Sequence, residues 1–75
     1  MTPEDFLEEL QELLRTESDL TMETVLDELD EWDSVAMLAI AGIAEDDFGI
    51  SLDVNDFKNF VTPRDIFDRL TSHGN

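Results

Sequence analysis

Residues 33–50 read DSVAMLAIAGIAEDDFGI, and this stretch decides the fold. Asp33 or Ser34 supplies a polar N-cap, and a glycine at position 49 is typical of a helix end, so the stretch predicts a helix over 34–48. At about 100° per residue, the acids near its end define a solvated side and the opposite side predicts a core face. The acids are Glu45, Asp46 and Asp47, and the predicted core face holds Met37, Ile40, Ala41, Ala44 and Phe48.

The first half of this predicted helix places apolar residues where solvent is expected. Val35, Ala39 and Gly42 fall on the solvated side, flanked by Leu38 and Ile43. One interpretation is a central helix that is buried on nearly all sides. The other is a docking surface beside Ser34. The pattern alone leaves both interpretations open.

A helix and a long loop are predicted before this stretch. Thr2 as the N-cap, followed by Pro3 and Asp5, predicts a helix over 2–16 whose leucines follow helical spacing. Residues 17–33 have no long period, and they predict a loop with one helical turn in 22–28. A loop of this length usually indicates a function or a crossover that is specific to the fold.

Two shorter elements are predicted after it. Asp53 caps a short helical turn over 54–59, and Thr62 followed by Pro63 starts the last helix. Residues 72–75 are expected to fray. Because no strand alternation or repeat is found, the sequence predicts an all-α bundle of three main helices and one short helix, with a long first loop.

Composition narrows the functional classes. The chain has 75 residues, with twenty Asp and Glu against four Lys and Arg, a formal charge of −16 and no cysteine. This predicts a single domain over 1–75 that does not bind nucleic acid and does not insert into membranes. Disulfides and thiol chemistry of the chain's own are excluded. Because the N-terminus lacks the pattern of a signal peptide, a cytoplasmic location is expected.

Ser34 and the acid-rich stretch 27–33 are the candidates for a reactive site and for a metal site. Ser34 as a nucleophile needs a base within reach, but the only histidine is His73 in the expected tail. The simple interpretation of Ser34 is an N-cap, although a helix N-terminus also favours an attached phosphoryl group. The acid-rich stretch 27–33 lacks the layout of a calcium-binding loop, so a solvated acidic surface and no metal site are predicted.

The run Asp33-Ser34-Val35 resembles the Asp-Ser-Leu motif of acyl carrier proteins, with valine in place of leucine. Leu29 before it, the run Glu45-Asp46-Asp47-Phe48-Gly49-Ile50 after it and Thr62 at the last helix extend the resemblance from Phe6 to Leu70. The resemblance implies the four-helix bundle of that family and Ser34 as the attachment point of 4′-phosphopantetheine, with Asp33 assisting the transferase or capping the helix. The arm ends in a thiol, which explains how a chain without cysteine carries thioesters.

The sequence departs from the common fatty-acid carriers at three further positions. Trp32 replaces a small residue, and Ala36 and Ala39 replace acids that the family often uses to meet basic patches on partner enzymes. Trp32 is either a partner contact or an aromatic that closes the loop onto the core. Recognition is expected to shift toward apolar contact and the far end of the helix. The predicted docking residues are Trp32, Val35, Leu38, Ala39, Glu45 and Asp46.

The resulting prediction is a monomeric, non-catalytic acyl carrier protein of a specialised lipid, envelope or secondary-metabolite pathway. Its expected partners are a phosphopantetheinyl transferase (holo-carrier synthase) and acyl-loading and acyl-transfer enzymes with basic or apolar docking patches. The small residues Ala41, Gly42 and Ala44 either leave room for an acyl chain or let helices approach closely. The alternatives are an aminoacyl or peptidyl carrier and an acidic helical interaction domain in which Ser34 is never modified.

Overall fold

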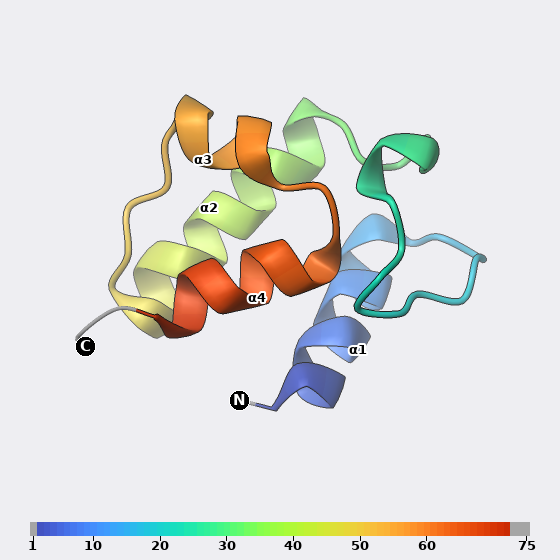
Figure 1. Cartoon of the computed structure of the whole chain (residues 1–75), viewed down its shortest axis with the longest axis horizontal. Helices are drawn as coiled ribbons and strands as arrows, with labels where there is room; N and C mark the ends of the chain where they lie inside the picture. The colour runs from blue at the N-terminus through green and yellow to red at the C-terminus, as the bar shows by residue number, and fades with distance from the viewer. Residues whose placement is uncertain (1, 73–75) are drawn as a thin grey trace.

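Each of the four helices over residues 2–72 begins directly after a residue that the sequence predicts as an N-cap, which for the second helix is Asp33, one of its two candidates. The computed structural model describes residues 2–72, and Figure 1 shows the course of the chain. The N-caps are Thr2, Asp33, Asp53 and Thr62, and the helices that follow them are α1 (Pro3–Leu14), α2 (Ser34–Phe48), α3 (Val54–Asn59) and α4 (Pro63–Thr71). A three-residue 3₁₀ turn, η1 (Leu26–Glu28), lies in the long first loop. The predicted all-α bundle is confirmed.

The ends of the two longest helices have clear local causes. Gly49 adopts φ 67° and ends α2 at the predicted residue, since glycine has no Cβ to strain this left-handed conformation. Arg15 adopts φ 55° and ends α1 two residues earlier than predicted. The Gln11 side chain donates to the carbonyl of Thr16, a buried residue just past this end. The predicted fraying tail lies outside the described residues except for Ser72.

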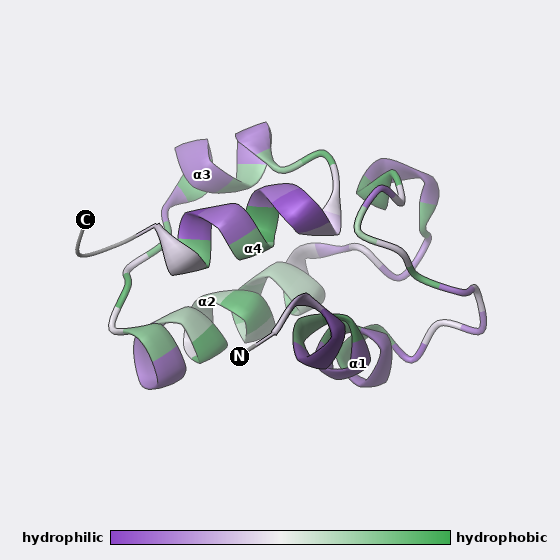
Figure 2. Ribbon diagram, turned by 60° about the horizontal axis from the view of Figure 1, so that its bottom comes forward, coloured by the Kyte–Doolittle hydropathy of each residue, from purple (hydrophilic) through white to green (hydrophobic). Residues whose placement is uncertain are grey.

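The core lies between α1, α2 and α4, which contact one another pairwise. Figure 2 shows that α2 is apolar along most of its length, with hydrophilic residues near its C-terminal end. The rings of Phe6 in α1 and Phe67 in α4 lie 5.7 Å apart between centroids. The fully buried large side chains include Phe6, Leu10, Leu26, Ile40, Ile66 and Leu70.

The long loop over residues 15–33 is attached to the start of α4. Leu26 donates its N–H to the carbonyl of Val61 at 2.9 Å, and Arg64 donates its N–H to the carbonyl of Met22 at 3.0 Å. The Arg64 guanidinium also pairs with Glu23, with 2.6 Å between nitrogen and oxygen. The buried side chains of Met22 and Leu26 lie on this loop, so the loop contributes to the core.

The buried side of α2 is rotated from the predicted one. Ile40 and Ala44 are buried as predicted, but the third buried residue is Ala36, which is 5% exposed. Met37 and Phe48 are only half-buried and pack against the core, and Ala41 is half-buried as well. The helix therefore turns Ala36 inward. The expectation that Ala36 stands in place of a surface acid that meets partner enzymes is wrong, because Ala36 is buried.

Asp65 fixes the start of α4. Its Oδ2 accepts hydrogen bonds from the backbone N–H of Val61 at 2.9 Å and of Thr62 at 3.1 Å. Because these bonds favour the ionised carboxylate, they hold the pKa of Asp65 below its ordinary value, and the bond from Val61 has the largest effect. The short connection between α3 and α4 is thus shaped by one carboxylate.

We expect Asp65→Ala to lower the free energy of unfolding by about 1 kcal/mol at neutral pH, because two backbone donors lose their acceptor. The pKa of Asp65 is lower in the folded chain than in the unfolded one. This stabilisation is therefore complete above the unfolded pKa and is lost as the pH falls through the folded pKa. Denaturant titrations of the parent and the variant across this range check the prediction, with the exposed Asp68→Ala as the control. A stability difference that stays constant into strong acid would contradict it.

Candidate functional site

Ser34 is the first residue of α2, and its side chain is exposed. The preceding residue caps the helix: Asp33 Oδ1 accepts from the N–H of Ala36 at 3.0 Å. The turn before it is held by the N–H of Trp32, which donates to the carbonyl of Leu29 at 3.1 Å. Of the two predicted caps, Asp33 is therefore the one used, and the Ser34 hydroxyl is presented at the surface at the N-terminus of a 15-residue helix.

A hollow of about 430 Å³ begins at Ser34 and lies between α2 and α3. Its α2 wall consists of Met37, Leu38 and Ala41. Its other wall comes from the segment leading into α3 and from α3 itself, and comprises Leu52, Asp53, Val54 and Phe57. Apart from Ser34 and Asp53, every residue that lines it is apolar. The exposed hydroxyl thus stands at one end of an apolar hollow.

The α3 wall of this hollow is held by a small number of contacts. None of the residues of α3 is buried. Its Asp56 pairs with Arg69 of α4, with 3.3 Å between Oδ1 and Nε, and the ring of Phe57 meets that of Phe60 edge-on at 5.5 Å between centroids. Hydrogen bonds from the Asp53 backbone and from Arg69 lower the pKa of Asp56, the backbone bond having the larger effect. Phe57 also packs against the core, so α3 is held by one ion pair and by the apolar contacts of its inner side.

A second, smaller hollow lies on another flank of α2, toward the end of α1. Its volume is about 310 Å³. It is lined by Leu13 and Leu14 of α1, by Glu31 and Asp33 of the loop, and by Val35, Ala36 and Ala39 of α2. The two chain neighbours of Ser34, Asp33 and Val35, therefore line a hollow separate from the one that begins at Ser34.

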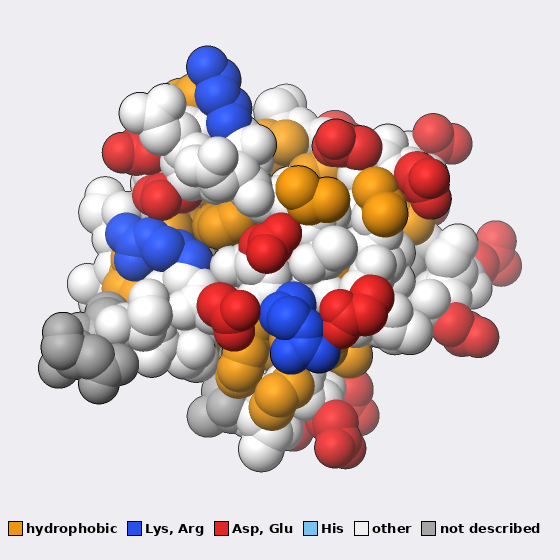
Figure 3. All heavy atoms as spheres, viewed as in Figure 1, with side chains coloured by type: hydrophobic (Ala, Val, Ile, Leu, Met, Phe, Trp, Pro, Cys, Tyr) orange, Lys and Arg blue, Asp and Glu red, His pale blue; other side chains and the backbone are white. Residues whose placement is uncertain are grey.

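Five of the six predicted docking residues are exposed. Val35 and Leu38 are 71% and 73% exposed, and Ala39, Glu45 and Asp46 are exposed as well. The interpretation of α2 as buried on all sides is therefore wrong. Figure 3 shows hydrophobic side chains at the surface among those of Asp and Glu, on one face of the molecule.

Trp32 is the exception. It is 8% exposed and belongs to the core cluster, so the structure places it in the core and not on the exposed side of α2. This supports the interpretation of an aromatic residue that closes the loop. An indole of this size contributes to stability mainly by the apolar area that it buries.

Sequence reasoning missed the part of the hollow that comes from outside α2. Leu52 and Val54 flank the predicted cap Asp53, and Val54 is 69% exposed. An apolar residue directly after a helix cap, in a helix too short to bury a full side, was the available signal. Pattern analysis within one helix cannot show that these residues face α2 across a hollow.

The remaining sequence predictions concern metal binding, His73 and insertion into membranes. Among residues 2–72, no cluster of three or more His, Asp or Glu side chains is arranged to hold a metal ion. His73 lies outside the described residues. No helix over residues 2–72 has both the length and the apolar character needed to span a bilayer.

Comparison with known proteins identifies the family. Residues 4–70 match the family model described as "Phosphopantetheine attachment site". No significant match was found among curated proteins or among solved structures. Domains of this family bear a 4′-phosphopantetheine prosthetic group, are generally non-catalytic, and act with a phosphopantetheinyl transferase and partner enzymes. Since the match spans nearly the whole chain and the fold is the expected helical bundle, the chain belongs to the phosphopantetheine attachment family of carrier proteins.

Proposed function

We propose that this protein carries acyl intermediates as thioesters on a 4′-phosphopantetheine arm attached to Ser34. The observation that carries the proposal is the apolar hollow that begins at the exposed Ser34 hydroxyl and continues between α2 and α3. A hydrocarbon chain gains free energy when apolar walls remove it from water. An aminoacyl group with a charged amine has little to gain from the same walls.

The surroundings of Ser34 fit the attached group. A phosphodiester on its Oγ would lie at the positive end of the α2 dipole, and beyond the capping carboxylate of Asp33 the first turn of α2 contains no acidic residue. Asp33 leaves the Ser34 hydroxyl available, since its own carboxylate caps the helix. When bound, the arm supplies the thiol that forms thioesters, which a chain without cysteine does not supply itself.

The exposed side of α2 is proposed as the docking face for the transferase and for acyl-loading and acyl-transfer enzymes. Val35, Leu38 and Ala39 give apolar contact near Ser34, while Glu45 and Asp46 offer negative charge about two turns further on. A partner that matches this face has an apolar patch with basic residues displaced to one side. Such a face favours a dedicated pathway over general fatty-acid synthesis. The proposed location of this pathway is the cytoplasm.

The test compares two cargoes on the same arm. The chain is loaded by a phosphopantetheinyl transferase from octanoyl-coenzyme A or from glycyl-coenzyme A, and Tm is measured for each loaded form. We expect the octanoyl form to have the higher Tm, because ligand burial in the folded state stabilises it, and the resonances of Met37, Leu38 and Ala41 to shift.

Two variants test whether the Tm difference between the cargoes depends on the hollow or on another part of α2. Ala41→Phe fills the hollow and should abolish the Tm difference between the two cargoes, whereas Ala39→Phe lies on the other flank and should preserve it. Each variant is compared only with its own glycyl form, so any general loss of stability cancels. Equal Tm values for the two cargoes in the parent would overturn the acyl assignment in favour of an aminoacyl or peptidyl carrier.

A further inference from the structure

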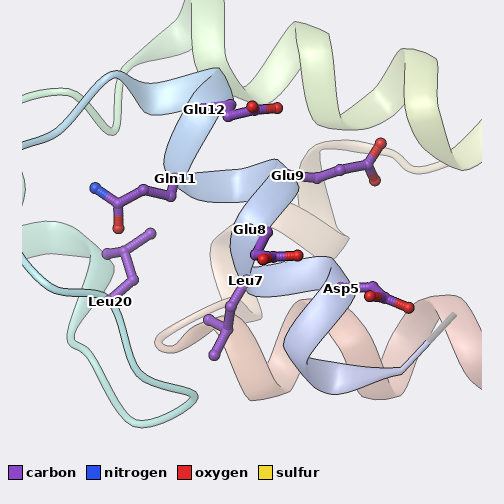
Figure 4. A pocket seen from close by; sticks show the side chains of 7 residues that line it. All are labelled: Asp5, Leu7, Glu8, Glu9, Gln11, Glu12 and Leu20. Carbon is purple, nitrogen blue, oxygen red and sulfur yellow. The ribbon is translucent and has the colours of Figure 1, made fainter.

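A groove of about 840 Å³ lies along α1, away from the residues that line the Ser34 hollow. In Figure 4, Leu7 and Gln11 of α1 lie on the same side as Leu20 of the long loop. The carboxylates of Asp5, Glu9 and Glu12 project along the other side of the helix, and Glu8 lies between the two rows. We call Leu7 and Leu20 the apolar strip of the groove, and Asp5, Glu9 and Glu12 its acidic row.

The apolar strip is formed from two segments that are joined to each other. Leu20 is half-buried and packs against the core, whereas Leu7 is half-buried but does not belong to the core cluster. The Gln11 side chain donates to the carbonyl of Thr16, which ties α1 to the start of the loop that carries Leu20. The side chain of Leu7 is therefore partly covered by the fold, and its remaining apolar surface lies at the groove.

The acidic row lacks compensation from the rest of the described chain. Residues 3–14 contain five acids and no Lys or Arg. The two salt bridges found over residues 2–72 involve Glu23 and Asp56, and neither reaches α1. Asp5, Glu9 and Glu12 recur about one helical turn apart, so they present negative charge at a regular spacing.

We propose that this groove is a second docking surface, and that its occupant is a cationic amphipathic helix of a partner protein. That helix would lie over Glu8, with Lys or Arg residues one turn apart along the edge that faces the acidic row and apolar residues along the edge that faces Leu7 and Leu20. A second copy of this chain is a poor occupant, because both copies carry a charge of −16. Nucleic acids and anionic membranes are repelled for the same reason.

This inference goes beyond the proposed function and does not depend on Ser34. The groove shares no lining residue with either hollow beside α2. A partner held on α1 would leave Ser34 and the exposed side of α2 accessible to enzymes. Tethering would then raise the effective concentration of a chosen enzyme at the arm without changing the site itself.

The test uses the full chain and a synthetic helical peptide of leucines and lysines, with its lysines one turn apart on one side. Amide and methyl chemical shifts are followed by NMR at low and at high salt. We expect the largest shifts over residues 5–12 and at Leu20. Glu9→Gln combined with Glu12→Gln should weaken binding about tenfold at low salt and much less at high salt. Leu7→Gln should weaken it by a similar factor at both.

Asp27→Asn combined with Glu28→Gln is the matched control, since it removes the same charge from two exposed residues of η1 that lie outside the groove and outside the proposed docking face. An equal loss of binding in this control, or shifts centred on α2, would show that the peptide responds only to net charge and would overturn the proposal. Transferase loading of Ser34 is measured by intact mass in the same variants and should not change. Failure of docking with normal loading thus rejects the α1 surface alone, and failure of loading rejects the proposed function alone.

Discussion

Replacing Ser34 with alanine should abolish attachment of 4′-phosphopantetheine completely while leaving the fold intact. The effect is all-or-none, because the substitution removes the only oxygen through which the phosphodiester forms at this site. Stability should be nearly unchanged, since Ser34 is exposed, alanine is the best helix former, and Asp33 keeps its capping bond to Ala36. Intact-mass spectrometry after incubation with coenzyme A and a transferase measures the attachment, and circular dichroism measures the fold.

The other described serines provide the control. Ser18, Ser51 and Ser72 are exposed as well, but none of them is the first residue of a helix. Ser51→Ala should therefore load as fully as the parent, and peptide mapping of the loaded parent should find the arm on Ser34 alone. Modification at another serine, or a parent chain that stays unloaded beside a carrier that the same transferase modifies, would reject Ser34 as the attachment point.

The helix starts could be predicted because they depend on chemistry within a few residues. Thr2, Asp33, Asp53 and Thr62 each precede a helix, and a polar side chain before an apolar run indicates this without reference to the rest of the chain. The glycine that ends α2 was readable for the same reason. The place of Ser34 at the surface followed from these local features.

The buried side of α2 could not be predicted in this way. Its first three turns contain almost only apolar residues, so they give no periodic signal, and the acids at its end were used to orient it. The actual orientation depends on α1 and α4, which lie against Ala36, Ile40 and Ala44. The packing of α1 and α4 therefore determines which side of α2 is buried, and the sequence of α2 alone does not indicate this side.

The burial of Trp32 likewise depends on distant contacts. The loop before it is held by bonds from Leu26 to Val61 and from Arg64 to Met22, which join parts of the chain that are far apart in sequence. The loop pattern contains nothing that indicates these partners. The hollow between α2 and α3 was missed for the same reason, because its walls belong to different helices.

An aspartate at position 36 should unfold much of the protein, whereas the same residue at position 39 should be tolerated. Ala36 is 5% exposed and belongs to the core cluster, so Ala36→Asp places a carboxylate at a nearly closed position beside the core, close to the carboxylate of Asp33. The expected cost is about 3 kcal/mol or more, a large part of the stability of a small domain. Ala39 is exposed, so Ala39→Asp should change the free energy of unfolding little. Denaturant titrations of the two variants measure the contrast.

The tolerated variant then tests partner choice. Ala39→Asp adds negative charge to the proposed docking face without disturbing the core. It should raise kcat/KM with a general fatty-acid enzyme that has a basic docking patch, chiefly at low salt, because surface charge acts mainly on the rate of encounter. A partner that requires apolar contact at this position should be weakened at all salt concentrations. If the parent is already as good a substrate as an ordinary fatty-acid carrier, the specialised-pathway proposal fails, while the assignment to the carrier family stands on separate grounds.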